Sequence, residues 1–227
     1  MARPKGKSAR VKHGPITMKQ AVNVKEAWVH AIQQATPPNA LVTVHWGKAP
    51  AKDPSKHPVE RIGQFRDGVK AWFKRHAPGV AFVWVEVREK TGKLGEHVHW
   101  AFHVPDDLRE AFAAHVSRLV AHQSVTVEQK AVDVRPVGPR WWDRYSYFMK
   151  GGTAEVRQWA EVPGTWSSSQ GKIEGPRIRV AHAIGPAARK ASETPLGGHS
   201  PVPATQLHKA AQTPSAAIKS AIEPIAA

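Results

Sequence analysis

The chain has 227 residues, a length that leaves room for one main domain. Its formal net charge is +15 and its pI is near 10.3, so polyanionic partners are favoured, nucleic acid first. It has no cysteine, so disulfides and thiolate metal sites are excluded. No apolar run approaches the ~18 residues of a membrane span, and the N-terminus lacks the apolar segment of a secretory signal, so we expect a cytoplasmic protein outside the membrane.

Aromatic residues are confined to the part of the chain that ends at Trp166, and the first acidic residue is Glu26. A packed core needs large apolar side chains, whereas polar and basic segments without them remain unfolded. The sequence therefore predicts a basic disordered arm over residues 1–16, a folded domain over 17–166, and a basic, then low-complexity C-terminal tail over 167–227.

Apolar periodicity and turn residues divide the predicted domain into helices and strands. In chain order they predict a helix over 17–35, a strand over 40–46, a helix over 58–76, strands over 80–88 and 97–104, a helix over 107–121, a strand over 131–137 and a helix over 140–150. This order indicates an α+β fold: a central antiparallel-type β-sheet with helices packed on one face and the active site on the other.

The segment His97-Val98-His99 lies in a predicted strand, where alternate side chains share one face, so both imidazoles point the same way. On the preceding strand we expect Glu86 to lie on the same face as the histidines. Two imidazoles and a carboxylate can hold one divalent ion and leave positions open for phosphate and water. The alternative is a solvent-facing strand whose alternate residues happen to be polar, because a His-x-His pattern alone is common.

The predicted helix over 140–150 carries both tyrosines of the chain. A helical wheel places Tyr145 on the apolar stripe and Tyr147 with Lys150 on the polar side, where residues three apart are neighbours. Tyr147 is therefore the candidate nucleophile, and Lys150 is the candidate cation that offsets charge on a phosphate. The alternative is an ordinary surface tyrosine and lysine at the end of a helix.

Three motifs in series resemble the HUH endonuclease superfamily, in particular its rolling-circle replication initiators (Rep proteins). They are the apolar run Ala40–His45, the pair His97-Val98-His99, and the segment Tyr147-Phe148-Met149-Lys150. The resemblance covers about residues 38–152. It implies a HUH/Rep-like nuclease domain in which His97, His99 and Glu86 hold Mg²⁺ or Mn²⁺. It also implies that Tyr147 attacks a DNA phosphodiester, leaving a free 3′-OH and a 5′-phosphotyrosine.

From this resemblance we expect sequence- or structure-directed nicking and joining of single-stranded DNA, which would initiate replication of a plasmid or phage. The expected partners are single-stranded DNA or a hairpin origin, and a separate helicase, because the chain has no Walker A motif. Basic residues near the tyrosine helix and downstream of it are candidates for contact with the DNA backbone. They are Arg140, Arg144, Lys172, Arg177 and Arg179.

Three other interpretations remain open. A transposase or relaxase of the same superfamily would use the same chemistry. A non-catalytic nucleic-acid-binding protein would use the charge alone. An iron or cupin-like metalloenzyme would use His97, His99 and Glu86 but would leave the tyrosine helix and the charge unexplained.

Overall fold

The structure is a computed structural model that describes residues 11–92, 95–138, 144–164 and 170–193. Its α-helices are α1 (Met18–Gln33), α2 (Pro58–His76), α3 (Arg109–Gln123), α4 (Ala154–Trp159) and α5 (Pro186–Glu193). Short 3₁₀ helices cover Trp46–Lys48, Asp106–Leu108, Arg144–Met149 (η4) and His182–Ile184 (η6). The strands are β1 (Lys12–His13), β2 (Ala40–His45), β3 (Trp84–Thr91), β4 (Gly95–Phe102), β5 (Val132–Pro136), β6 (Ile173–Glu174) and β7 (Ile178–Val180).

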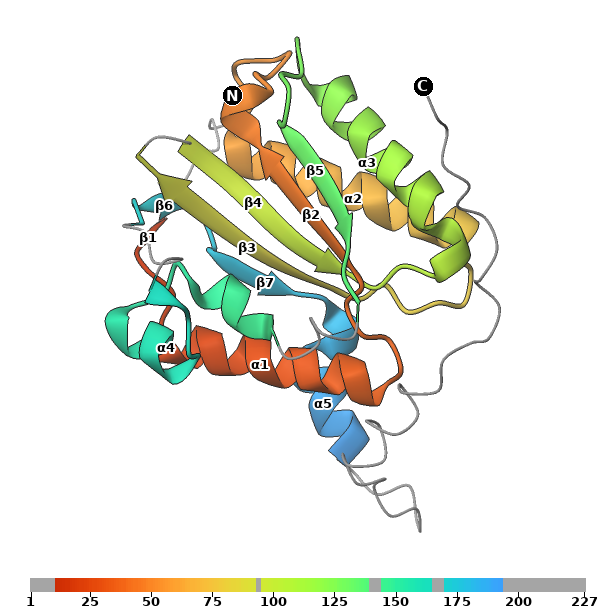
Figure 1. Ribbon diagram of the computed structural model, residues 1–227. Coiled ribbons are helices and arrows are strands. Elements are labelled where there is room, and N and C mark those ends of the chain that lie inside the picture. Colours follow the sequence, from red (N-terminus) through yellow and green to blue (C-terminus); the bar gives the residue numbers. More distant parts are fainter. Residues whose placement is uncertain (1–10, 93–94, 139–143, 165–169, 194–227) are drawn as a thin grey trace, which may run out of the picture. The chain divides into compact units, whose positions relative to one another are not determined.

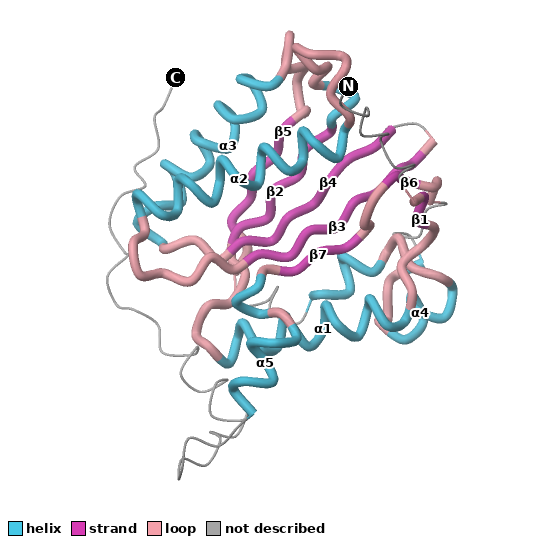
Figure 2. The backbone as a smooth tube through the Cα atoms, turned by 180° about the vertical axis from the view of Figure 1, so that it is seen from behind, coloured by secondary structure: helices cyan, strands magenta, loops and turns pink. Residues whose placement is uncertain are grey.

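Five strands form one antiparallel sheet in the order β5-β2-β4-β3-β7, and β1 pairs separately with β6. Helices α2 and α3 lie side by side on one face of the five-stranded sheet, behind it in Figure 1 and in front of it in Figure 2. The predicted α+β class with an antiparallel sheet is confirmed.

The helix-covered face carries the main aromatic core. Trp100 of β4 packs on Phe65 of α2, with ring centroids 4.7 Å apart, and Phe102 packs on Phe112 of α3 at 5.4 Å. Because side chains alternate along a strand, His97 and His99 must point to the opposite face. We call this opposite side the histidine face.

The histidine face is partly covered as well. Helix α1 runs beside β7, and its Trp28 packs on Phe148 of η4 with ring centroids 5.6 Å apart. This second layer is hydrophobic because α1 buries one apolar stripe, whose members include Ala21, Val24 and Trp28. The packing of α1 on η4 places Lys150, the residue that follows η4, beside His99.

Several helices and strands begin or end at other residues than the sequence predicted. The predicted helix over 58–76 matches α2, while the strands β3 and β4 are displaced toward the turn between them. The predicted helix over 140–150 is present as the 3₁₀ helix Arg144–Met149, and residues 139–143 lie outside the described residues. Local spacing therefore located this element but did not determine its helix type.

The predicted domain boundary after Trp166 is wrong. Strand β7 is an edge strand of the main sheet, and the compact unit extends to Glu193. Part of the predicted disordered arm is folded too, because Lys12 and His13 pair with β6 and Ile16 is fully buried. Residues 1–10 of the arm and 194–227 of the tail lie outside the described residues. The missed strands are only two and three residues long, too short for a periodic signal.

None of the described helices combines the length and the apolar character needed to cross a membrane.

Candidate metal centre

Glu89, His97 and His99 form one buried cluster on the histidine face. Strand pairing places Glu89 of β3 opposite His97 of β4. One ligand atom from each of the three side chains lies within 4.8 Å of the other two, and each residue is less than 5% exposed. A cluster of two imidazoles and one carboxylate with this spacing can hold a metal ion.

The outer nitrogens of both imidazoles have partners that orient the rings. Nδ1 of His99 lies 2.8 Å from Oγ1 of Thr43, and Nδ1 of His97 lies 3.4 Å from the carbonyl oxygen of Gly95. Binding of a metal at Nε2 would place the ring proton on Nδ1, where these oxygens can accept it, the usual arrangement of metal-binding histidines. Nε2 of His97 and His99 lie 3.1 and 3.6 Å from Oε2 of Glu89.

The protonation states also suit metal binding. Burial lowers the pKa of His99 to about 4, which keeps the ring neutral at neutral pH. Burial opposes the charge of Glu89, but hydrogen bonds with His97 and His99 outweigh it and hold the pKa of Glu89 well below its ordinary value. Oε1 of Glu89 is buried and has no hydrogen-bond partner among the described residues. A carboxylate with one such oxygen fits a site that accepts a cation.

Lys150 and Tyr147 reach the same cluster. Nζ of Lys150 lies 3.1 Å from Nε2 of His99 and 3.3 Å from Oε2 of Glu89, and it lies 4.2 Å from the centre of the Tyr147 ring. The Tyr147 ring packs edge-on against His99, with centroids 5.4 Å apart. The sequence-predicted pairs His97/His99 and Tyr147/Lys150, about fifty residues apart in the chain, therefore meet at one place.

Tyr145 points elsewhere. Its ring lies 6.1 Å from that of Trp159 and 5.6 Å from Nζ of Lys25, which belongs to α1. The two tyrosines point to different places, as the helical wheel predicted, but both are partly buried and pack against the core. In a 3₁₀ helix residues three apart align, which suits Tyr147 and Lys150.

The predicted position of Glu86 is wrong. Glu86 pairs with Trp100 in the ladder and lies on the helix-covered face, where the Trp100 indole nitrogen donates to Oε2 of Glu86 at 3.1 Å. The ladder ends at Thr91 opposite Gly95, so three residues of the sequence separate the two strands. A loop one residue shorter or longer would exchange the two faces, and this register puts Glu89 beside His97.

The candidate DNA-binding residues differ in their surroundings. Arg177 is 1% exposed, and its guanidinium group donates to the backbone carbonyls of Gly14, Arg88 and Gly171. Its assignment to DNA contact is therefore wrong: it ties β7 to the arm and to β3.

The other four are placed as follows. Lys172 is exposed, and Arg179 is partly exposed beside Glu86. Arg140 lies outside the described residues, and Arg144 lies in η4 with a side chain that is not described.

Sequence reasoning missed Glu89, Thr43 and His45 as parts of this site. His45 pairs with His97 in the ladder, and the two rings stack with centroids 4.9 Å apart. Gly95 was the available signal, because glycine adopts positive φ easily and three-residue hairpin loops use such a residue. In the structure Gly95 has a φ of 65°, and the loop length fixes the register.

No family model, curated protein sequence or solved structure matches the chain.

Proposed function

We propose that the chain nicks and rejoins single-stranded DNA through Tyr147. The observation that carries this proposal is the meeting of Tyr147 and Lys150 with the Glu89–His97–His99 cluster. A nucleophile, a cation and a ligand set for a divalent ion at one place are the components that phosphoryl transfer requires. The net charge of +15 favours a polyanionic substrate.

Glu89, His97 and His99 would hold the ion, Mg²⁺ or Mn²⁺. Such an ion supplies a Lewis acid that polarises the scissile phosphate. The carboxylate oxygen suits either ion.

The residues of the chain would carry out a transesterification. The phenol oxygen of Tyr147 forms a bond to phosphorus as the bond from phosphorus to the 3′ oxygen breaks. The phenol loses its proton and the 3′ oxygen gains one, so the products are a 5′-phosphotyrosine and a free 3′-OH. Lys150, beside the Tyr147 ring, would offset negative charge on the phosphate oxygens. Attack by a 3′-OH reverses the reaction and joins the strand.

The decisive experiment incubates the full chain with Mn²⁺ and a pool of labelled single-stranded and hairpin oligonucleotides, and measures covalent protein–DNA adduct on denaturing gels. We expect adduct with the wild-type chain and with Tyr145→Phe, and none with Tyr147→Phe. Tyr145→Phe is a matched control because it removes the other phenol of the same 3₁₀ helix. An adduct that survives Tyr147→Phe would refute the mechanism.

A non-catalytic nucleic-acid-binding protein is the second candidate. It is favoured by one observation: the ammonium of Lys150 already forms an ion pair with Glu89, so the cluster can be satisfied without a metal. This candidate predicts salt-dependent binding of DNA with no effect of Mn²⁺ and no adduct.

A replication initiator, a transposase and a relaxase would share this chemistry and differ in their DNA target. Mapping the phosphate that becomes attached to Tyr147 would separate them. The partnership with a helicase and the activity on a plasmid or phage origin belong to the first of these proposals.

A further inference from the structure

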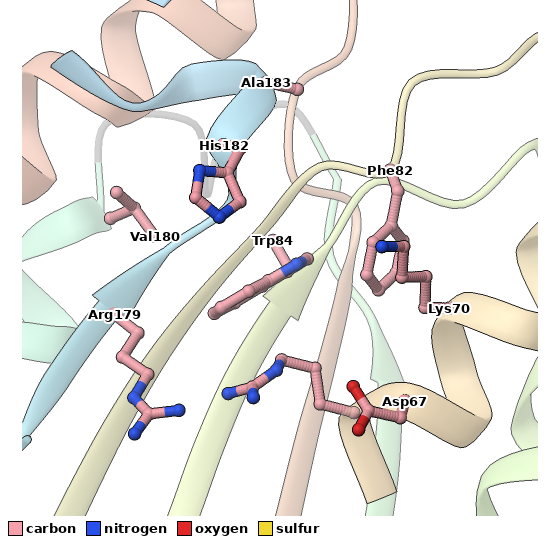
Figure 3. Close-up of a pocket in the computed structure, with 9 residues that line it drawn as sticks. Asp67, Lys70, Phe82, Trp84, Arg179, Val180, His182 and Ala183 are labelled. Atoms are coloured by element: carbon pink, nitrogen blue, oxygen red, sulfur yellow. The ribbon is translucent and has the colours of Figure 1, made fainter. Parts of the chain in front are cut away.

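A cavity of about 600 Å³ opens on the helix-covered side of the sheet, at the edge formed by β7. Its walls come from α2, β3, β7 and η6. Figure 3 shows the ring of Trp84 at the centre, with Arg179 and His182 on one side and Lys70 and Phe82 on the other. Trp84 belongs to the same alternating set of β3 as Glu86, so the cavity lies across the sheet from Glu89, His97 and His99.

The cavity is lined by cations from separate elements. Arg66 and Lys70 come from α2, and Arg179 comes from β7. Arg66 and Arg179 both approach the buried Glu86, with closest N···O distances of 3.5 and 4.0 Å. A guanidinium group has five N–H donors. Arg66 gives one long hydrogen bond to Oε2 of Glu86, while Arg179 approaches Oε1 of Glu86 without a hydrogen bond. The carboxyl group of Glu86 therefore lies near both guanidinium groups and leaves most of their donors able to reach a ligand.

The centre of the cavity is aromatic. The guanidinium carbon of Arg66 lies 5.4 Å from the centre of the Trp84 ring, and the Phe82 and Trp84 rings are 6.3 Å apart. An aromatic surface beside convergent guanidinium groups suits a ligand with a planar ring and a phosphate, because bases stack on aromatic rings and Arg forms paired hydrogen bonds with phosphate oxygens.

We propose that this cavity binds a nucleotide, with its phosphate held by Arg66, Arg179 and Lys70 and its base against Trp84 and Phe82. This site is separate from the nicking centre and needs no metal. The nucleotide can be a free nucleoside phosphate or one unit of a single strand, since both present the same phosphate and base.

The test is calorimetric titration of the full chain in EDTA, which removes metal-dependent binding on the histidine face. The probes are thymidine, deoxyribose 5-phosphate, thymidine 5′-monophosphate and a pentanucleotide, the single-stranded oligothymidylate of five residues. We expect thymidine 5′-monophosphate to bind about fivefold or more tighter than each of the two fragments, since each lacks either the base or the phosphate. Equal or tighter binding of the pentanucleotide would identify a single strand as the source, and its failure to bind would identify the free nucleotide.

Two exposed residues give variants that leave the core intact. Lys70→Gln should weaken binding of thymidine 5′-monophosphate about three- to tenfold, and Asp67→Asn should strengthen it, because Asp67 lines the cavity with the wrong charge for a phosphate. Arg118→Gln, a matched loss of one charge on the exposed surface of α3, should change nothing.

The proposal is overturned if thymidine 5′-monophosphate does not bind, if it binds no better than deoxyribose 5-phosphate, or if Lys70→Gln and Arg118→Gln have equal effects. None of these results bears on the adduct assay with Tyr147→Phe, because that assay depends on Mn²⁺ and on the other face of the sheet.

Discussion

Two glutamates three residues apart on β3 are equally buried, but they differ in the face of the sheet they occupy, in their partners and in the direction of their pKa shift. Glu86 and Glu89 are each 1% exposed. Burial raises the pKa of Glu86, and the cations 3.5 and 4.0 Å away do not reverse that effect. Burial also acts on Glu89, but its hydrogen bonds with His97 and His99 and the charge of Lys150 lower its pKa.

The difference shows that the charge state of a buried carboxyl group depends on the geometry of its partners and not on its degree of burial alone. Oε2 of Glu89 has three nitrogen atoms within 3.6 Å, from His97, His99 and Lys150. Among the described residues, Glu86 accepts a hydrogen bond of ordinary length from the Trp100 indole and a long one from Arg66. Glu89 is therefore held as an anion among potential co-ligands, whereas Glu86 serves to position arginine side chains on the opposite face.

The largest expected difference between the two carboxylates is in metal affinity. Glu89→Gln should lower the affinity for Mn²⁺ by more than about 100-fold, because even the loss of an outer partner of a ligand typically costs 10- to 100-fold. Glu86→Gln, the same change on the other face, should leave it within about twofold. Titration with Mn²⁺ followed by electron paramagnetic resonance measures both. Equal losses would mean that the cluster is not the Mn²⁺ site.

The orientation of His99 should matter nearly as much. Thr43→Val keeps the shape of the side chain and removes the hydroxyl 2.8 Å from Nδ1 of His99, so Mn²⁺ affinity should fall about 10- to 100-fold. Thr91→Val is the matched control on the β3–β4 hairpin, because Oγ1 of Thr91 has no hydrogen-bond partner among the described residues. If Thr91→Val lowers the affinity equally, orientation of His99 by Thr43 is not the cause.

Lys150 should act in opposite directions on metal and on DNA. Lys150→Met removes a cation 3.3 Å from Oε2 of Glu89, so it should raise Mn²⁺ affinity about tenfold. It should also lower the rate of adduct formation, because the phosphate loses a positive neighbour. Comparing the Mn²⁺ titration with single-turnover adduct rates tests this. A variant with weaker Mn²⁺ binding would show that the ammonium does not compete with the ion.

The smallest expected effect is the pH dependence of stability due to Glu86. Burial disfavours the charged form of Glu86, so its pKa is raised in the folded protein. The protonated side chain therefore favours folding most below the ordinary glutamate pKa, and this contribution is lost as the pH rises through the raised pKa. Glu86→Gln should therefore be more stable than the wild type at pH 7, by on the order of 1 kcal/mol.

That advantage should shrink as the pH falls toward about 4.5, near the ordinary glutamate pKa. The charged groups that face Glu86 are Arg66 from α2, Arg179 from β7 and Arg88 from its own strand. Urea unfolding at both pH values measures the difference. A Glu86→Gln variant that is less stable at pH 7 would show that the arginine contacts outweigh burial.

Much of the fold was predictable because it follows from local patterns. The apolar period located α2 to the residue, and the alternation along β4 placed His97 and His99 on one face. Tyr147 was preferred over Tyr145 on the same grounds. Strand β7 was not predictable, because three residues at the edge of a sheet carry no period and are defined by the strand that they pair with.

Spacing within one strand is enough to place His97 and His99 on one face, and spacing within one short helix is enough to turn Tyr145 and Tyr147 in different directions. The order of the helices and strands along the chain indicates the α+β class. The tertiary structure decided which glutamate joins the histidines, because strand register depends on a loop length that shifts every side chain between faces. It also decided that Lys150 meets Glu89 and that Arg177 is buried among backbone carbonyls, since both contacts join segments more than fifty residues apart.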